Sequence, residues 1–132
     1  MASALSEGGM APEEVDYIAA HGTSTLKNDA TETMAIKRVF GDHARRLLIS
    51  SNKGQIGHTI SAAGVSNVIC AVKAINEGLV PPTMNLRNPD AECDLDYVAN
   101  ESRRVGIRGA IANAFAFGGQ NTALAIRAWS GT

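Results

Sequence analysis

Cysteine, long apolar runs and charge of a single sign are all scarce in this chain. The 132 residues include two cysteines, Cys70 and Cys93, too few and too far apart for a disulfide framework or a zinc site. The formal net charge of −1 argues against nucleic acid or an anionic membrane as a partner. No apolar run reaches the roughly 18 residues of a membrane span, and the N-terminus lacks the basic region and apolar core of a secretory signal. We therefore expect one globular domain in the cytoplasm.

Short apolar runs alternate with helical patterns, which predicts an α/β layered fold. Buried strands are expected over 15–20, 47–51, 109–115 and 122–129, with a further short strand near 95–98. The strands 109–115 and 122–129 flank a glycine-containing loop and are predicted to form a hairpin. Both are apolar on both faces, so we expect their sheet to be covered on each side.

Two longer helices are predicted. The first spans 29–40, with Asp29 as its N-cap and Glu32 three residues later as in a capping box. The second spans 60–76 and begins with small residues at 61–64, where we expect another backbone to approach closely. Its predicted apolar stripe consists of Val68, Val72, Ile75 and Leu79.

Two histidines lie in matching places, because His21 and His58 each follow a predicted strand closely. Ligands of open α/β sheets bind at the carboxyl ends of the strands. The adjacent Gly22 and Gly57 allow a tight turn or a close approach of the backbone. A lone histidine is more often structural, and two in matched settings make a functional role about as well supported as a structural one. His43 lies in a polar turn and is expected to be exposed to solvent.

Four sequence blocks carry a more specific signal than the two histidines alone. They are His21-Gly22-Thr23-Ser24-Thr25 with Asp29 and Glu32 after it, Lys53-Gly54-Gln55-Ile56-Gly57-His58 running on to Ala62-Ala63-Gly64, Val80 to Leu86, and Asn113 to Asn121. In this order they resemble the motifs of the two-histidine β-ketoacyl-[acyl-carrier-protein] synthases. These are the condensing enzymes of fatty-acid and polyketide synthesis, within the thiolase superfamily. The resemblance covers residue 12 to the end of the chain.

The resemblance implies a decarboxylative Claisen condensation, which joins an acyl group held on a cysteine to malonyl-acyl-carrier protein. It implies that His21 and His58 are catalytic and donate N–H groups to the developing enolate charge. It also implies that Lys53 is part of the catalytic set, in a buried ion pair with Glu32. No cofactor is required, since cysteine and histidine chemistry suffices.

Further roles follow from the same resemblance. Asp29, like Glu32, is expected to support the site structurally. Thr23 and Thr25 are expected either to bind the phosphopantetheine arm of the carrier protein or to satisfy the loop backbone. Phe117 occupies the position of a gatekeeper, whose backbone together with Gly118 is expected to form the gate and oxyanion hole. Phe115 is expected to be plain core.

The implied organisation is that residues 1–132 form a partial C-terminal domain. It would be the C-terminal half of a thiolase-like fold, a layered α/β/α structure whose mixed sheet ends in an antiparallel hairpin. We expect this chain to lack the first, central strand of its own half and the N-terminal half that carries the nucleophilic cysteine. Cys70, in mid-helix, and Cys93, between two acids, are poor substitutes.

The expected partners are that N-terminal half and an acyl carrier protein with phosphopantetheine-bound acyl and malonyl groups. The complete enzyme is expected to dimerise, and this chain alone is expected to be inactive. The alternative is a non-catalytic subunit resembling a chain-length factor, or an inactive fragment, and retention of His21, His58 and Lys53 argues against the former. A metal site built from His21, His43 and His58 is not expected, because no pair has the helical spacing of ligands.

Overall fold

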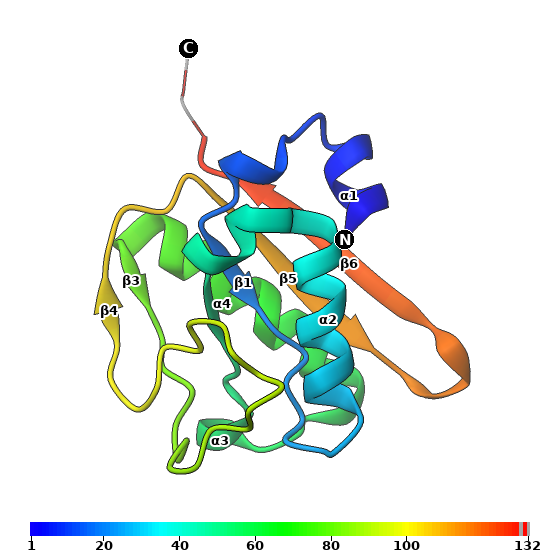
Figure 1. Cartoon of the computed structure of the whole chain (residues 1–132). Coiled ribbons are helices and arrows are strands. Elements are labelled where there is room, and N and C mark those ends of the chain that lie inside the picture. Colours follow the sequence, from blue (N-terminus) through cyan, green and yellow to red (C-terminus); the bar gives the residue numbers. More distant parts are fainter. Residues whose placement is uncertain (130, 132) are drawn as a thin grey trace.

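The computed structural model describes residues 1–129 and 131, and a four-stranded mixed sheet organises them in the order β2-β1-β5-β6 (Figure 1). Strand β1 (Tyr17–Ala19) runs parallel to both β2 (Leu48–Ser50) and β5 (Gly109–Phe115). Strand β6 (Asn121–Arg127) is antiparallel to β5 and closes the predicted hairpin.

Helices and a small second sheet complete the chain. The helices are α1 (Ala2–Glu7), α2 (Asn28–Phe40), α3 (Lys53–Ile56) and α4 (Ala63–Glu77), with 3₁₀ turns at Pro12–Glu14, Gly41–Arg46, Ile60–Ala62 and Phe117–Gly119. The second sheet pairs β3 (Leu79–Val80) with β4 (Arg103–Arg104). No helix among the described residues is long and apolar enough to cross a membrane.

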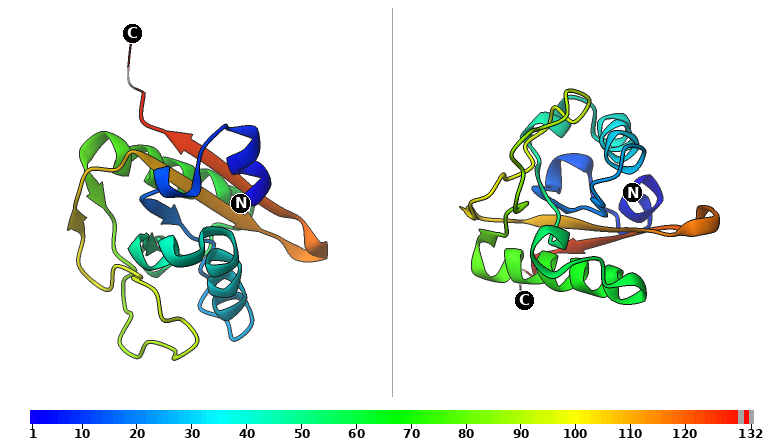
Figure 2. Two further views of the ribbon diagram at one scale, coloured as in Figure 1. Left: turned by 45° about the horizontal axis from the view of Figure 1, so that its top comes forward. Right: turned by 90° about the horizontal axis from the view of Figure 1, so that it is seen from below.

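The sheet has helices on both faces, with α1 and α2 on one side and α4 on the other (Figure 2). Successive residues of a strand point to opposite faces, so each face collects its own apolar set. Toward α2, the fully buried Ile18 lies in register with Ile49 on β2 and Ile111 on β5. The predicted α/β layered fold that ends in an antiparallel hairpin is therefore confirmed.

Helix α4 approaches its face of the sheet through small residues. Its buried positions are Ala63, Asn67, Ala71 and Ala74. A Cβ added at Gly64 would lie 3.3 Å from the Cβ of Ala114 on β5, so the predicted close approach is confirmed there. The predicted apolar stripe is wrong at Val72, whose residue surface is 39% exposed, because the buried stripe is the alanine side of the helix.

The first strand that this half is expected to lack leaves no opening in the sheet. Strands β1 and β5 pair directly, with Ile18 opposite Ile111, so the middle of the sheet has no gap. At the β2 edge, the Ile49 N–H donates to the Asp96 carbonyl at 2.8 Å. The segment 95–98, expected as a strand, forms no strand in the structure. It contributes this edge contact, a bridge between Leu48 and Asp96, and the Val98 carbonyl, which accepts the Thr83 N–H at 2.8 Å.

Three smaller expectations also differ from the structure. Strand β6 is an edge strand and is not covered on both faces, since Leu124 is half-exposed. Helix α2 begins at Asn28, so Asp29 lies inside its first turn and is not the N-cap. The His43 ring is half-buried, because its Nε2 donates to the Val15 carbonyl at 2.8 Å.

Removing side-chain atoms from the isoleucine register should destabilise the chain strongly. We expect Ile111→Ala to lower the free energy of unfolding by about 2–5 kcal/mol, because it leaves a cavity in the buried face of the sheet. Ile69→Ala on the outer face of α4 is the matched control and should cost less than about 1 kcal/mol. Urea unfolding of both variants tests this, and equal losses would contradict the assignment of the core.

Candidate active site

His21 is held at the carboxyl end of β1 by hydrogen bonds to its backbone. Its N–H donates to Glu32 Oε1 at 3.0 Å, and the Gly22 N–H donates to Glu32 Oε2 at 2.9 Å. The His21 carbonyl accepts a hydrogen bond from Lys53 Nζ at 2.5 Å. The side chain is buried, so its position follows from that of the backbone.

The predicted capping-box role of Glu32 is wrong, because its carboxylate accepts hydrogen bonds from other segments. Its residue surface is only 4% exposed, and besides His21 and Gly22 it accepts a hydrogen bond from Asn113 Nδ2 at 2.9 Å. Asn28 Nδ2 adds a longer contact at 3.4 Å. A buried carboxylate is tolerable when several donors replace its water. Glu32 is thus bonded to the loop after β1, and its supporting role in the site stays a prediction.

Lys53 does not form the expected direct ion pair with Glu32. Within the described residues, its Nζ lies within 4.0 Å of no carboxylate and instead donates to the His21 carbonyl. Burial lowers the pKa of Lys53, while the charges of Glu32 and Asp29 oppose that shift. Lys53 therefore acts on the loop through a backbone acceptor, with the two carboxylates at longer range.

Gly22 allows the loop to pass close to the end of β2. Its φ is +39°, and an added Cβ would lie 2.6 Å from the Ser51 Cβ. The Ser51 hydroxyl donates to the Gly22 carbonyl at 2.7 Å. This contact brings the ends of β1 and β2 together, as the matched placement of the two histidine motifs predicts.

The two histidine rings meet at this end of the sheet. The ring centroids of His21 and His58 are 5.7 Å apart with an interplanar angle of 83°. His58 is exposed, and its Nδ1 accepts the Ile60 N–H at 3.0 Å. A neutral His58 therefore carries its proton on Nε2, which is left as a donor.

His21 is a neutral imidazole at pH 7. Burial, followed by the nearby positive charges of Lys53 and His58, lowers the pKa of His21 to about 4. Its buried Nδ1 has no hydrogen-bond partner within the described part of the chain. The neutral His21 ring can thus offer an N–H donor beside the Nε2–H of His58.

The hairpin residues are placed differently from expectation. Phe115 is not plain core, since it is only partly buried and its ring centroid lies 5.3 Å from that of His21. Phe117 is fully exposed at the tip of the hairpin, which projects from the rest of the chain (Figure 1). The gate and oxyanion roles of Phe117 and Gly118 stay predictions.

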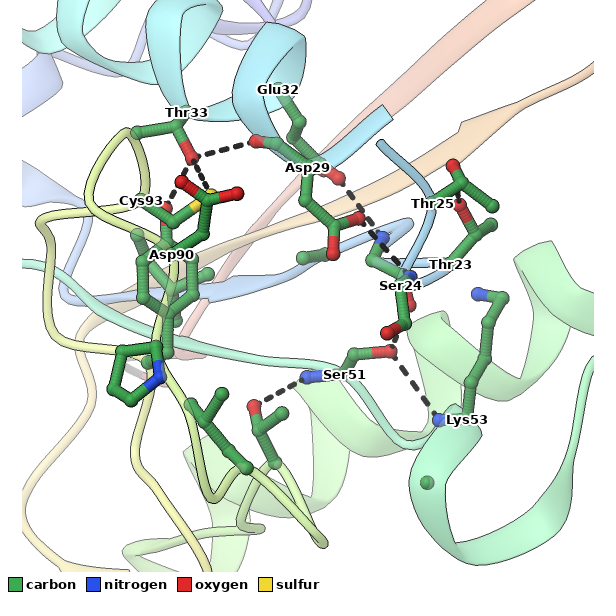
Figure 3. A pocket seen from close by; sticks show the side chains of 18 of the residues that line it. Thr23, Ser24, Thr25, Asp29, Glu32, Thr33, Ser51, Lys53, Asp90 and Cys93 are labelled. Atoms are coloured by element: carbon green, nitrogen blue, oxygen red, sulfur yellow. Dashed lines mark hydrogen bonds between the residues drawn. The ribbon is translucent and has the colours of Figure 1, made fainter. Parts of the chain in front are cut away.

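A cleft of about 590 Å³ opens beside the histidine loop and is lined by Lys53 and His58. Figure 3 shows Thr23 and Thr25 together at one end, and their hydroxyls are hydrogen-bonded to each other at 2.9 Å. Asp29 Oδ1 accepts the Ser24 N–H of this loop at 3.2 Å. Among the described residues, the two threonine hydroxyls beside the cleft therefore bond each other and no group of the loop backbone.

The cysteines lie in unremarkable places. Cys93 lines the far end of the cleft, where its sulfur accepts a hydrogen bond from the Thr33 hydroxyl at 3.5 Å. Cys70 is half-buried on α4 and accepts one from Asn52 Nδ2 at 3.4 Å. In the described range, no cluster of three or more His, Cys, Asp or Glu side chains could hold a metal ion.

Two buried amide side chains that belong to the site were not identified from the sequence. Asn113 on β5 donates to Glu32, and Asn67 on α4 donates to the carbonyls of Ala20 and Asn113 at 2.9 and 2.8 Å. Each is a polar residue within an otherwise small and apolar run. That isolation in the run is the signal that could have found them, because a buried amide needs dedicated partners.

Comparison with known proteins agrees with this geometry. Residues 1–87 match the family described as the C-terminal domain of beta-ketoacyl synthase. This match includes both histidines, Lys53 and Glu32, and it covers more than half of the chain. The chain therefore belongs to the beta-ketoacyl synthase family through this C-terminal domain.

Individual relatives are similar over nearly the whole chain. It is 50% identical over 127 residues to 3-oxoacyl-[acyl-carrier-protein] synthase 2 of Synechocystis sp., covering 96% of this chain and 30% of that protein. It is 51% identical over 127 residues to nodulation protein E of Rhizobium meliloti, covering 96% of this chain and 32% of that protein. The chain thus spans about a third or less of the curated relatives it matches.

Solved structures share the fold. One is a type II polyketide synthase acyl-carrier protein in complex with its ketosynthase bound to the hexaketide. It matches with a TM-score of 0.93 and 36% identity, over 96% of this chain and 31% of that chain. A beta-ketoacyl synthase from Burkholderia phymatum matches with a TM-score of 0.88, 36% identity, and coverage of 95% and 30%.

Neutralising the buried Glu32 carboxylate should lower the stability of the fold. We expect Glu32→Gln to lower the free energy of unfolding by about 1–3 kcal/mol, because an amide group must face N–H donors that the carboxylate satisfied. Glu77→Gln, at an exposed pair with Lys73, is the matched control and should change it by less than about 0.5 kcal/mol. Chemical denaturation measures both, and an equal response would contradict the role of Glu32.

The titration of His21 is the second test. NMR titration of the His21 ring should give a pKa of about 4, against the ordinary value of 6.5. Since the folded chain favours the neutral ring, this group's contribution is complete above about pH 6.5 and is lost as pH falls toward about 4. Lys53→Met should raise the pKa of His21 without restoring the ordinary value, because burial remains. A wild-type ring that titrates near 6.5 would refute this account.

Proposed function

We propose that this chain supplies the histidine-bearing part of an enzyme that performs decarboxylative Claisen condensation with malonyl-acyl-carrier protein. The observation that carries the proposal is the pair of imidazoles at 5.7 Å, one buried and neutral and the other with Nε2 left as a donor. Both lie beside a cleft, where Glu32 of α2 and Lys53 of α3 hold the His21 backbone and the Ile60 N–H orients His58. Membership of the beta-ketoacyl synthase family supports the same reaction.

The chemistry requires stabilisation of a transient oxyanion. When the malonyl thioester loses carbon dioxide, the electrons of the broken C–C bond pass to the thioester oxygen as an enolate. N–H groups of His21 and His58 donate to that oxygen, and preorganised donors in a site that excludes water stabilise such charge strongly. The enolate carbon then attacks the acyl thioester, and the cysteine thiolate leaves.

The substrates would be acyl and malonyl groups on the phosphopantetheine arm of an acyl carrier protein. Thr23 and Thr25 provide hydroxyls in the cleft that could be redirected from each other to the amides of the arm. The complex of a ketosynthase with an acyl-carrier protein among the similar structures supports such a partner. With this reaction and this partner, we expect the complete enzyme to work in the cytoplasm.

The nucleophilic cysteine is assigned to a companion N-terminal part. Cys70 and Cys93 each accept a hydrogen bond from a neighbouring side chain, and neither lies beside a histidine ring in the described contacts. The outer face of α4 presents Val65, Ile69 and Val72 at helical spacing with no partner among the described residues. A stripe of this kind fits a second layer of protein. We assign it to the companion part and expect the complete enzyme to dimerise.

A non-catalytic subunit resembling a chain-length factor is the alternative. Such a subunit has no need of a His21 ring held beside His58, or of the Lys53 contact that fixes the His21 backbone. The joint presence of these features favours the catalytic assignment, and the activity of a complete enzyme distinguishes the two.

A chimeric synthase tests the proposal. This chain would replace the matching segment of the Synechocystis relative, and condensation of acyl and malonyl groups on carrier protein would be measured. We expect turnover by the chimera and none by the isolated chain. His21→Ala and His58→Ala should each lower turnover by at least about 100-fold, because each removes an oxyanion donor.

The matched control is His43→Ala, since His43 contacts Val15 before β1, at the opposite end of the strand from His21. It should leave turnover within about threefold of the unmodified chimera. A folded chimera without turnover would refute the condensing function. Turnover by the isolated chain would refute the need for a companion.

A further inference from the structure

The ladder between β1 and β5 ends two residues before His21. Its last pair is Ala19 with Ala112, and the next register position holds Ala20 and Asn113. There the carbonyls of Ala20 and Asn113 both accept hydrogen bonds from Asn67 Nδ2, at 2.9 and 2.8 Å. An amide nitrogen carries two hydrogens, so the Asn67 side chain joins the two strands where they separate.

This contact completes a set of four bonds around His21. The peptide unit before His21 is held at the Ala20 carbonyl by Asn67 and at the His21 N–H by Glu32. The unit after it is held at the His21 carbonyl by Lys53 and at the Gly22 N–H by Glu32. With both flanking peptide planes held, the φ and ψ of His21 have little freedom, and the direction of its Cβ follows.

We propose that Asn67 is a positioning residue for His21, acting from α4 while Glu32 acts from α2 on the opposite face of the sheet. Its importance for turnover rests on the proposed condensing function, but the positioning itself does not. Asn67 is fully buried on the alanine face of α4, between Ala63 and Ala71. An apolar side chain there would leave the two carbonyls without the Asn67 donors. The amide is therefore retained for its donors.

The test compares Asn67→Leu with Asn76→Leu in the full chain. Leucine has the same number of side-chain heavy atoms as asparagine and removes both donors, whereas Asn76 is exposed on the same helix. In Asn67→Leu, the His21 ring should be less firmly held in its buried place. We expect NMR titration to show its pKa rising by about one unit, and the chimera to lose roughly tenfold in turnover. Asn76→Leu should change neither quantity.

The outcomes separate positioning from general stability. If Asn67→Leu lowers the free energy of unfolding but leaves the His21 titration at its wild-type value, Asn67 is merely structural and the inference is overturned. If Asn67→Leu does not fold, Asn67→Ser keeps one donor and should give an intermediate shift, and a wild-type titration would again overturn it. A chimera of native sequence without turnover would remove the proposed function, while the NMR comparison would still decide the positioning.

Discussion

The hydrogen bonds of the buried Glu32 carboxylate hold the rest of this site together. A carboxylate removed from water must recover its solvation from protein donors, and here the donors are backbone N–H groups of His21 and Gly22 and the side chain of Asn113. Because those donors belong to the loop after β1 and to β5, satisfying one charge on α2 draws these segments together. The loop conformation and the charge are therefore mutually dependent.

The lysine and serine after β2 extend this arrangement. Lys53 binds the His21 carbonyl and Ser51 binds the Gly22 carbonyl, so the same two residues are held from a second strand. Parallel strands bring their carboxyl ends to one edge of a sheet, which explains why motifs some thirty residues apart meet there. The buried His21 is held rigidly by this packing, whereas the exposed His58 is oriented by the local bond from Ile60.

Much of the fold was accessible from pattern alone. The apolar runs before His21 and Ser51 form β1 and β2, and the helical period after Asn28 forms α2, because burial and backbone pairing act over a few neighbouring residues. The predictions for Val72 and Glu32 are wrong for the same reason, because each relies on local spacing and tertiary packing decides the outcome. Val72 fits the helical period but faces outward, since the sheet accepts only the small side of α4. Glu32 stands at capping-box spacing from Asp29 but bonds a distant loop, because Asp29 lies inside the helix.

The sequence by itself determined the residue types and their order: two histidines after short apolar runs, a lysine five residues before the second, and a glycine-rich hairpin. Those features identify the family, because local spacing is preserved however the chain folds. Tertiary structure alone decided that β1 pairs directly with β5, that Lys53 binds a carbonyl and not Glu32, and that Asn67 and Asn113 belong to the site. These depend on which residues meet across the sheet, and strand order and distances across layers are not encoded in any single stretch of chain.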